Sequence, residues 1–176
     1  LDADLSKPNG TSSLYKEFPD RCFDVGIAEA NMVGVAAGLA AYGYKPIVVT
    51  FAPFATRRVC DQIAVSVAYA KQNVKIVGTD PGITAELNGG THMSFEDIAT
   101  LRSIPTMTIY DAVDDTQVYQ AIKQIMNTDG PCYIRMPRKA AQPVYDENYK
   151  FALNKADVIT KGNDITIVAS GIMVAE

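Results

Sequence analysis

The chain has 176 residues, 48% of them hydrophobic, which is enough for one hydrophobic core of ordinary size. Its net charge of -4 gives no electrostatic reason to expect a nucleic acid or an anionic membrane as partner, and no apolar run reaches the roughly 18 residues that a membrane span requires. Cys22, Cys60 and Cys132 stand far apart without a CxxC pair, which argues against a disulfide framework or a zinc site and favours a reduced, cytoplasmic compartment.

The first part of the chain predicts a loop, a strand end and a helix. Residues 1–20 are polar and rich in turn-forming residues, so we expect a surface loop with one short helix near residues 12–17. Residues 23–26 have the pattern of a strand end. Residues 27–42 are rich in alanine and glycine and predict a helix that stops at Gly43.

The helix over residues 27–42 carries one charged residue, Glu29, in its first turn. The helix macrodipole favours an acid there, so Glu29 fits an exposed, dipole-stabilising role. A helix of small, uncharged residues is more often buried, however. A buried carboxylate tends to be protonated or held by a partner, which makes Glu29 a candidate for chemistry. Gly34 and Gly38 each cost roughly 1 kcal/mol of helix stability relative to alanine, so we expect another chain to approach them closely.

The chain then alternates between strands and helices. Strands are predicted at residues 46–51, 74–78, 106–110 and 132–136, and helices at residues 55–71, 94–104 and 116–126. At the start of the helix predicted over residues 94–104, SFED has the capping-box pattern, with Ser94 as the cap and Asp97 as the acid that completes it. The alternation predicts an α/β fold with a parallel sheet covered by helices on both faces.

The end of the chain has a different character. We expect a domain over residues 1–139, a polar linker over residues 140–163 and the truncated start of a second domain over residues 164–176. Residues 165–169 predict a strand that begins a βα unit. The sequence therefore indicates a piece of a larger protein.

Candidate functional residues follow the predicted strands. In parallel α/β sheets ligands bind at the carboxyl ends of the strands, where these loops should converge. The loops carry Glu29, Phe51 with Phe54, His92 and Arg138. Each has an ordinary explanation: an aromatic pair is often core, a lone histidine is usually solvated, and an arginine can end a strand as well as anchor a phosphate.

Familiar phosphate-binding and catalytic motifs are absent. The chain has no GxGxxG, no GxxxxGK[ST], no nucleophile elbow and no HExxH. Arg57 and Arg58 fit a solvated helix face. If a phosphorylated cofactor binds, another polypeptide must hold its phosphates.

Five motifs together resemble the pyrimidine-binding domain of the transketolase family of thiamine diphosphate enzymes, including the form whose C-terminal half is a separate chain. They are DADLS, RCFDVGIAEANMVGVAAGLA, TFAPFATRR, GGTH with SFEDIATLR, and GPCYIRMPRK, in the family's order. The resemblance implies that Glu29 hydrogen-bonds N1′ of the aminopyrimidine, that Phe54 stacks on this ring and that Phe51 completes the pocket wall. His92 would contact the substrate near the reacting carbon. Mg2+ or Ca2+ and the diphosphate would be held by the PP domain of an N-terminal partner subunit.

Two positions depart from the family pattern. Asn88 falls where transketolases usually have an aspartate that contacts a substrate hydroxyl, while Arg138 matches an arginine that contacts the substrate phosphate. Asp80 falls where many transketolases have a phosphate-contacting histidine, and it could repel a phosphate or pair with a neighbouring arginine. The related deoxyxylulose-phosphate synthases also carry an aspartate there.

The resemblance predicts the C-terminal subunit of a split transketolase, inactive by itself, in a homodimer or heterotetramer. The activity would be transfer of a two-carbon ketol group between a ketose and an aldose, both sugar phosphates. A deoxyxylulose-phosphate synthase and a ketoacid dehydrogenase β subunit are alternative enzymes. A non-catalytic interaction module that kept the fold is an alternative of another class.

Overall fold

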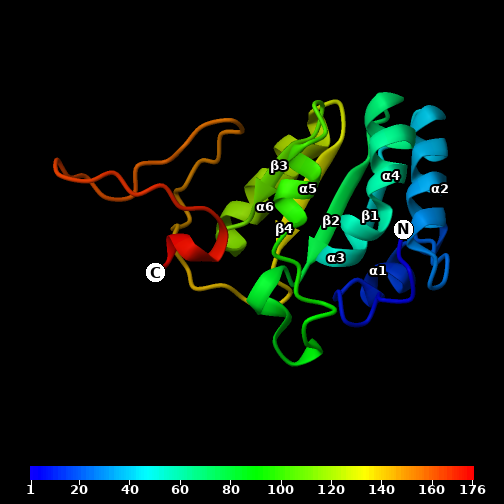
Figure 1. Ribbon diagram of the computed structural model, residues 1–176, viewed down its shortest axis with the longest axis horizontal. Coiled ribbons are helices and arrows are strands. Elements are labelled where there is room, and N and C mark those ends of the chain that lie inside the picture. Colours follow the sequence, from blue (N-terminus) through cyan, green and yellow to red (C-terminus); the bar gives the residue numbers. More distant parts are fainter.

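The computed structural model describes residues 1–176 and contains one four-stranded sheet. Its strands are β1 (Ile47–Phe51), β2 (Lys75–Thr79), β3 (Thr108–Asp111) and β4 (Cys132–Met136). All neighbours pair in parallel, in the order β1-β2-β4-β3 (Figure 1). The predicted parallel α/β fold is confirmed.

Two short extended segments lengthen the sheet beyond β1. Asp2 forms single parallel bridges to Val49 of β1 and to Asp24. The strand end predicted over residues 23–26 is thus reduced to one bridge. Between these segments lie the short helix α1 (Ser12–Glu17), close to its predicted position, and a 3-10 turn (Pro19–Arg21).

One face of the sheet is covered by α2 (Glu29–Ala41), by the helical segments that follow β1, and by α5 (Asp97–Arg102). Val48, Ile76 and Tyr133 point to this face from three adjacent strands. They belong to a buried apolar cluster that also includes Met32, Val33, Ala36, Val59, Ile63, Val67 and Leu101. This core holds α2, and with it Glu29, against the sheet.

The opposite face is covered by α6 (Asp115–Asn127). Val77 and Ile134 pack there against Ala121 and Ile125 of this helix. Successive strand residues therefore alternate between two apolar layers, as expected of a sheet that is buried on both faces.

The single helix predicted over residues 55–71 is divided at a kink. The structure has α3 (Ala52–Ala55), a 3-10 turn (Arg57–Val59), α4 (Cys60–Gln62) and a π-helix (Ile63–Tyr69). At the kink Thr56 has the non-helical angles φ -127° and ψ -88°. Its hydroxyl donates a hydrogen bond to the carbonyl of Ala52 at 2.7 Å, a side-chain contact that competes with the regular helical pattern.

The capping box predicted at SFED is not formed. Ser94 is buried and its hydroxyl has no hydrogen-bond partner. The Asp97 carboxylate instead accepts hydrogen bonds from the Tyr133 hydroxyl at 2.9 Å and from Nε of Arg135 at 2.7 Å. These buried, charge-assisted contacts to β4 take the place of local capping. Gly78 leaves room for them, because a Cβ there would lie 2.5 Å from the Tyr133 hydroxyl.

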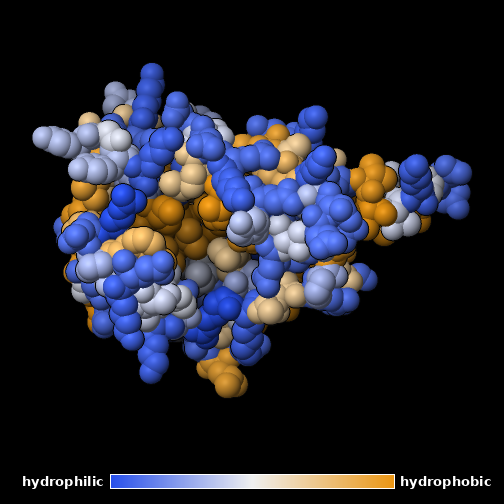
Figure 2. Space-filling view, turned by 180° about the vertical axis from the view of Figure 1, so that it is seen from behind, coloured by the Kyte–Doolittle hydropathy of each residue, from blue (hydrophilic) through white to orange (hydrophobic).

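The strand predicted over residues 165–169 is not formed either. Ile165, Ile167 and Val168 are 80%, 87% and 91% exposed, on an excursion that leaves the sheet in Figure 1 and shows apolar surface in Figure 2. A single strand needs a neighbour to pair with, and this segment has none within the chain. No helix of the structure is long and apolar enough to cross a membrane.

Candidate functional site

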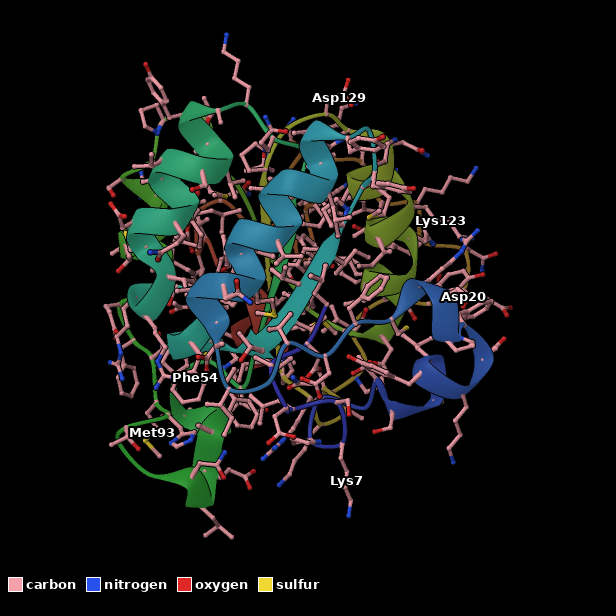
Figure 3. The ribbon with its side chains drawn as sticks, turned by 90° about the vertical axis from the view of Figure 1, so that its right-hand side faces the viewer. Lys7, Asp20, Phe54, Met93, Lys123 and Asp129 are labelled. Carbon is pink, nitrogen blue, oxygen red and sulfur yellow. The ribbon has the colours of Figure 1, made fainter.

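Most of the candidate residues lie at the carboxyl ends of the strands. Phe51 ends β1 and Phe54 follows in α3, while Asp80 follows β2 and Arg138 follows β4. Figure 3 shows Phe54 at this end of the sheet, close to Met93, and Asp129 at the opposite end. The topology therefore gathers side chains from distant parts of the chain at one edge.

Phe51, Phe54 and His92 form one aromatic cluster. The ring centres of the two phenylalanines are 6.0 Å apart, and the imidazole centre lies 5.6 Å from Phe51 and 5.2 Å from Phe54. Both contacts of the imidazole are edge-to-face, a favourable geometry for aromatic rings. The Thr91 hydroxyl lies 2.9 Å from Nδ1 of His92. The histidine is thus held against the wall that the phenylalanines form.

Glu29 is the first residue of α2 and is only 5% exposed. Nη1 of Arg58 donates a hydrogen bond to its Oε1 at 2.6 Å. A buried carboxylate is costly without such a partner. The ion pair therefore gives the buried Glu29 carboxylate a charged partner in a largely water-excluded position.

Arg58 also connects Glu29 to the aromatic cluster. Its guanidinium carbon lies 3.7 Å from the centre of the Phe54 ring. The sequence predicts a solvated side chain at Arg58, whereas the structure places it in contact with the aromatic cluster. Spacing alone does not predict this contact, because the non-helical backbone at Thr56 lies between Phe54 and Arg58.

Arg57, the other arginine of the pair, holds the loop that carries His92. Nη2 donates a hydrogen bond to the Thr91 carbonyl at 3.0 Å, and Nη1 pairs with Oε1 of Glu96 at 2.8 Å. These contacts lie on both sides of His92 in the sequence. They join the segment after β1 to the loop that begins at Gly89.

Asp80 and Arg138 form a second ion pair at the same edge. Nε of Arg138 lies 2.6 Å from Oδ2 of Asp80, a charge contact without the alignment of a hydrogen bond, and the Arg138 backbone N–H donates to Oδ1 at 3.2 Å. Burial raises the pKa of Asp80, and these contacts with Arg138 oppose the shift. The Arg138 guanidinium also lies 5.4 Å from the centre of Phe51. Of the two roles that the sequence left open for Asp80, pairing is the one observed.

Asn88 does not join this network. It ends the 3-10 helix Gly82–Asn88 in the loop after β2, and its side chain makes no hydrogen bond. Nowhere in the structure do three or more histidine, cysteine, aspartate or glutamate side chains gather in a way that could hold a metal ion.

The residues at the carboxyl edge of the sheet match a known protein family. The model of the transketolase pyrimidine-binding domain matches residues 1–143. The chain belongs to this family. Membership implies the use of thiamine diphosphate, whose aminopyrimidine gives the domain its name.

The most similar transketolases include subunits of split enzymes. A 6-deoxy-6-sulfo-D-fructose transketolase subunit of Clostridium sp. (strain MSTE9) is 56% identical over all of this chain and 55% of its own length. A putative transketolase C-terminal section of Methanocaldococcus jannaschii is 42% identical over all of this chain and 56% of its length. The chain thus spans little more than half the length of these relatives.

A solved structure agrees with these relatives. It is a split-gene transketolase described as an inactive beta4 tetramer, with a TM-score of 0.87 and 41% sequence identity. The match covers 99% of this chain and 56% of that one. The transketolase fold is therefore shared over almost the whole chain.

Proposed function

We propose that the chain is the pyrimidine-binding half of a split transketolase, which transfers a two-carbon ketol group between a ketose and an aldose. The observation that carries this proposal is the placement of a flat cation between Glu29 and Phe54. The Arg58 guanidinium is planar, lies over the Phe54 ring and donates to the Glu29 carboxylate. The site therefore accepts a planar group that stacks on one side chain and donates a hydrogen bond to the other.

The pyrimidine ring of thiamine diphosphate is planar, and its N1′ can donate to a carboxylate when it carries a proton, so the residues fit the cofactor. Bound there, the cofactor supplies the carbon nucleophile that carries the ketol group. Glu29 would accept the hydrogen bond from N1′, Phe54 would provide the stacking face and Phe51 would support it. The burial of Glu29 excludes water, which strengthens such a hydrogen bond.

Three further residues of the chain would act on the substrate. His92, held against the aromatic wall, would hold or move a proton at a substrate oxygen. Asn88 would contact a hydroxyl group, and Arg138 would bind the anionic end of the sugar. One relative is named for a sulfonated ketose, so this end is either a phosphate or a sulfonate.

The rest of the active site would belong to an N-terminal partner subunit. Its PP domain would hold the diphosphate together with Mg2+ or Ca2+, in a homodimer or heterotetramer in the cytoplasm. Two facts support a partner: the relative from Clostridium sp. is named a transketolase subunit, and the related beta4 tetramer is described as inactive. Residues 140–163 would link the pyrimidine-binding domain to a C-terminal domain.

The decisive test is Glu29→Gln in the complex assembled with the partner subunit. The amide keeps the size of the side chain but cannot carry the carboxylate's charge, so kcat should fall by about 100-fold or more. Asp115→Asn is a matched control, because Asp115 is also an acid at the first residue of a 13-residue helix. A helix-dipole role would make the two variants alike, and wild-type turnover of Glu29→Gln would refute the proposal.

A second enzyme is favoured by a relative and by the resemblance at Asp80. A 1-deoxy-D-xylulose-5-phosphate synthase is 36% identical over 95% of this chain, and the resemblance gives these synthases, which join pyruvate to glyceraldehyde phosphate, an aspartate at the position of Asp80. The assembled complex should therefore be assayed with sugar phosphates and with pyruvate plus glyceraldehyde phosphate. Turnover of only the second pair would replace the transketolase assignment.

A further inference from the structure

Arg58 contacts the two side chains that the proposed function assigns to the pyrimidine ring. Its Nη1 lies 2.6 Å from Oε1 of Glu29, and its guanidinium carbon lies 3.7 Å from the centre of the Phe54 ring. Guanidinium is planar, stacks on aromatic faces and donates hydrogen bonds to carboxylates. An aminopyrimidine ring makes the same two kinds of contact, so the two groups cannot occupy this place together.

We infer that Arg58 is a further functional residue of the pyrimidine site, which takes the place of the ring in the cofactor-free subunit and has to leave before the ring binds. The inference rests on the proposed function. Arg58 keeps Glu29 from being a buried, unpaired charge when no cofactor is present. It is a positioning residue in that state and a competitor of the cofactor.

The exposures of the two partners show which one moves. The Glu29 side chain is 6% exposed and is fixed at the start of α2, whereas the Arg58 side chain is 45% exposed. Only Arg58 therefore has a direct path into solvent. Its long, flexible stem allows it to release the carboxylate without any movement of the backbone.

This role has a signature that a purely structural contact lacks. Removal of Arg58 should destabilise the cofactor-free protein, because Glu29 loses its partner. The same removal should tighten the binding of thiamine diphosphate, because no ion pair has to be broken. A side chain that only supported the fold would weaken both properties when removed.

Arg57 provides a matched control. It is the adjacent residue, its side chain is also 45% exposed, and it also forms an ion pair. Its partners are Glu96 and the Thr91 carbonyl, and it contacts neither Glu29 nor Phe54. The two arginines thus separate loss of a surface charge from loss of the contact with the pyrimidine site.

The experiment is titration calorimetry of thiamine diphosphate with Mg2+ into the complex assembled from the full subunits. Compared with wild type, Arg58→Ala should bind roughly fivefold more tightly, whereas Arg57→Ala, which loosens the His92 loop, should not bind more tightly than wild type. Arg58→Lys, which keeps the charge but not the flat donor, should lie between wild type and Arg58→Ala. Scanning calorimetry without the cofactor should show a lower Tm for Arg58→Ala than for wild type.

Unchanged or weaker binding by Arg58→Ala overturns the inference, and so does an equal gain in Arg57→Ala. If Arg58→Ala does not assemble, Arg58→Lys decides by the same criterion of tighter binding than wild type. Failure of the proposed function is distinguishable, because a wild-type complex that binds no thiamine diphosphate refutes that function itself.

Discussion

At the edge of the sheet, the Arg138 guanidinium forms an ion pair with Asp80 and would also bind the anionic group of a substrate. Asp80 is 2% exposed, and its carboxylate lies 2.6 Å from Nε of Arg138. A phosphate carries about -1.5 to -2 charges at neutral pH, whereas a sulfonate carries one, so the nearby carboxylate repels a phosphate more strongly. Asp80 therefore favours a sugar sulfonate over a sugar phosphate as the substrate.

Asp80→Asn should lower the KM for a ketose phosphate by about fivefold and the KM for the matching ketose sulfonate by less. The amide keeps the oxygen that accepts the Arg138 backbone N–H but removes the negative charge. Steady-state kinetics of the assembled complex with both sugars would measure the effect. Equal changes for the two sugars would show that Asp80 does not discriminate by charge.

At the scale of an element, the start of α6 depends on Asp114. Its Oδ1 accepts a hydrogen bond from the Gln117 N–H, and its Oδ2 accepts from the N–H groups of Val144 and Tyr145, each at 2.8 Å. Burial by itself would raise the pKa of Asp114, but these backbone donors outweigh it and lower the pKa below its ordinary value. One carboxylate thus caps the helix and fastens the segment after the sheet.

Asp114→Asn should reduce the free energy of unfolding by about 2 kcal/mol at neutral pH, because the amide keeps the cap but turns N–H donors toward Val144 and Tyr145. The folded-state pKa is lowered, so the contribution is complete above the ordinary value of 3.8 and is lost as the pH falls through the folded pKa. Urea unfolding at several pH values should show the two proteins converging in acid. A difference in the free energy of unfolding that does not depend on pH would contradict this explanation. Asp115→Asn, at the exposed neighbouring residue, is the control.

At the scale of the whole molecule, the outer face of α2 is unusually bare. A Cβ added at Gly34 or Gly38 would meet nothing within 4 Å, and Val35 on the same helix is 39% exposed. In Figure 1 this helix lies at the outer edge of the molecule, on the side away from α6. The predicted contact with another subunit is therefore sterically open.

Gly38→Leu should leave the chain folded, because the added side chain has space and leucine favours a helix by roughly 1 kcal/mol over glycine. It should weaken association with a second subunit, since the backbones could no longer approach closely. Analytical ultracentrifugation would measure the change in assembly. Lys123→Leu, on the exposed face of α6, adds a leucine elsewhere and should assemble like wild type, while normal assembly of Gly38→Leu would argue against an interface at α2.

The sequence by itself determined the layers of this protein and the edge at which its candidate site lies. Apolar strands that alternate with helices specify a parallel sheet, and the carboxyl ends of such strands meet at one edge. Phe51, Phe54 and His92 follow from this rule, as does Glu29 from the lone charge in an uncharged helix. These features depend on residues that are close in sequence or on the period of a whole element.

Only the tertiary structure decided which charged groups pair. Arg58 contacts Glu29, which is 29 residues away in the sequence. Arg135 donates a hydrogen bond to the Asp97 carboxylate, which therefore does not form the predicted capping box. The predicted strand over residues 165–169 likewise lacks a neighbour to pair with. Such contacts join segments that are far apart in sequence, so no local pattern encodes them. The functional importance inferred for Arg58 therefore became visible only when α2 was packed beside the segment that follows β1.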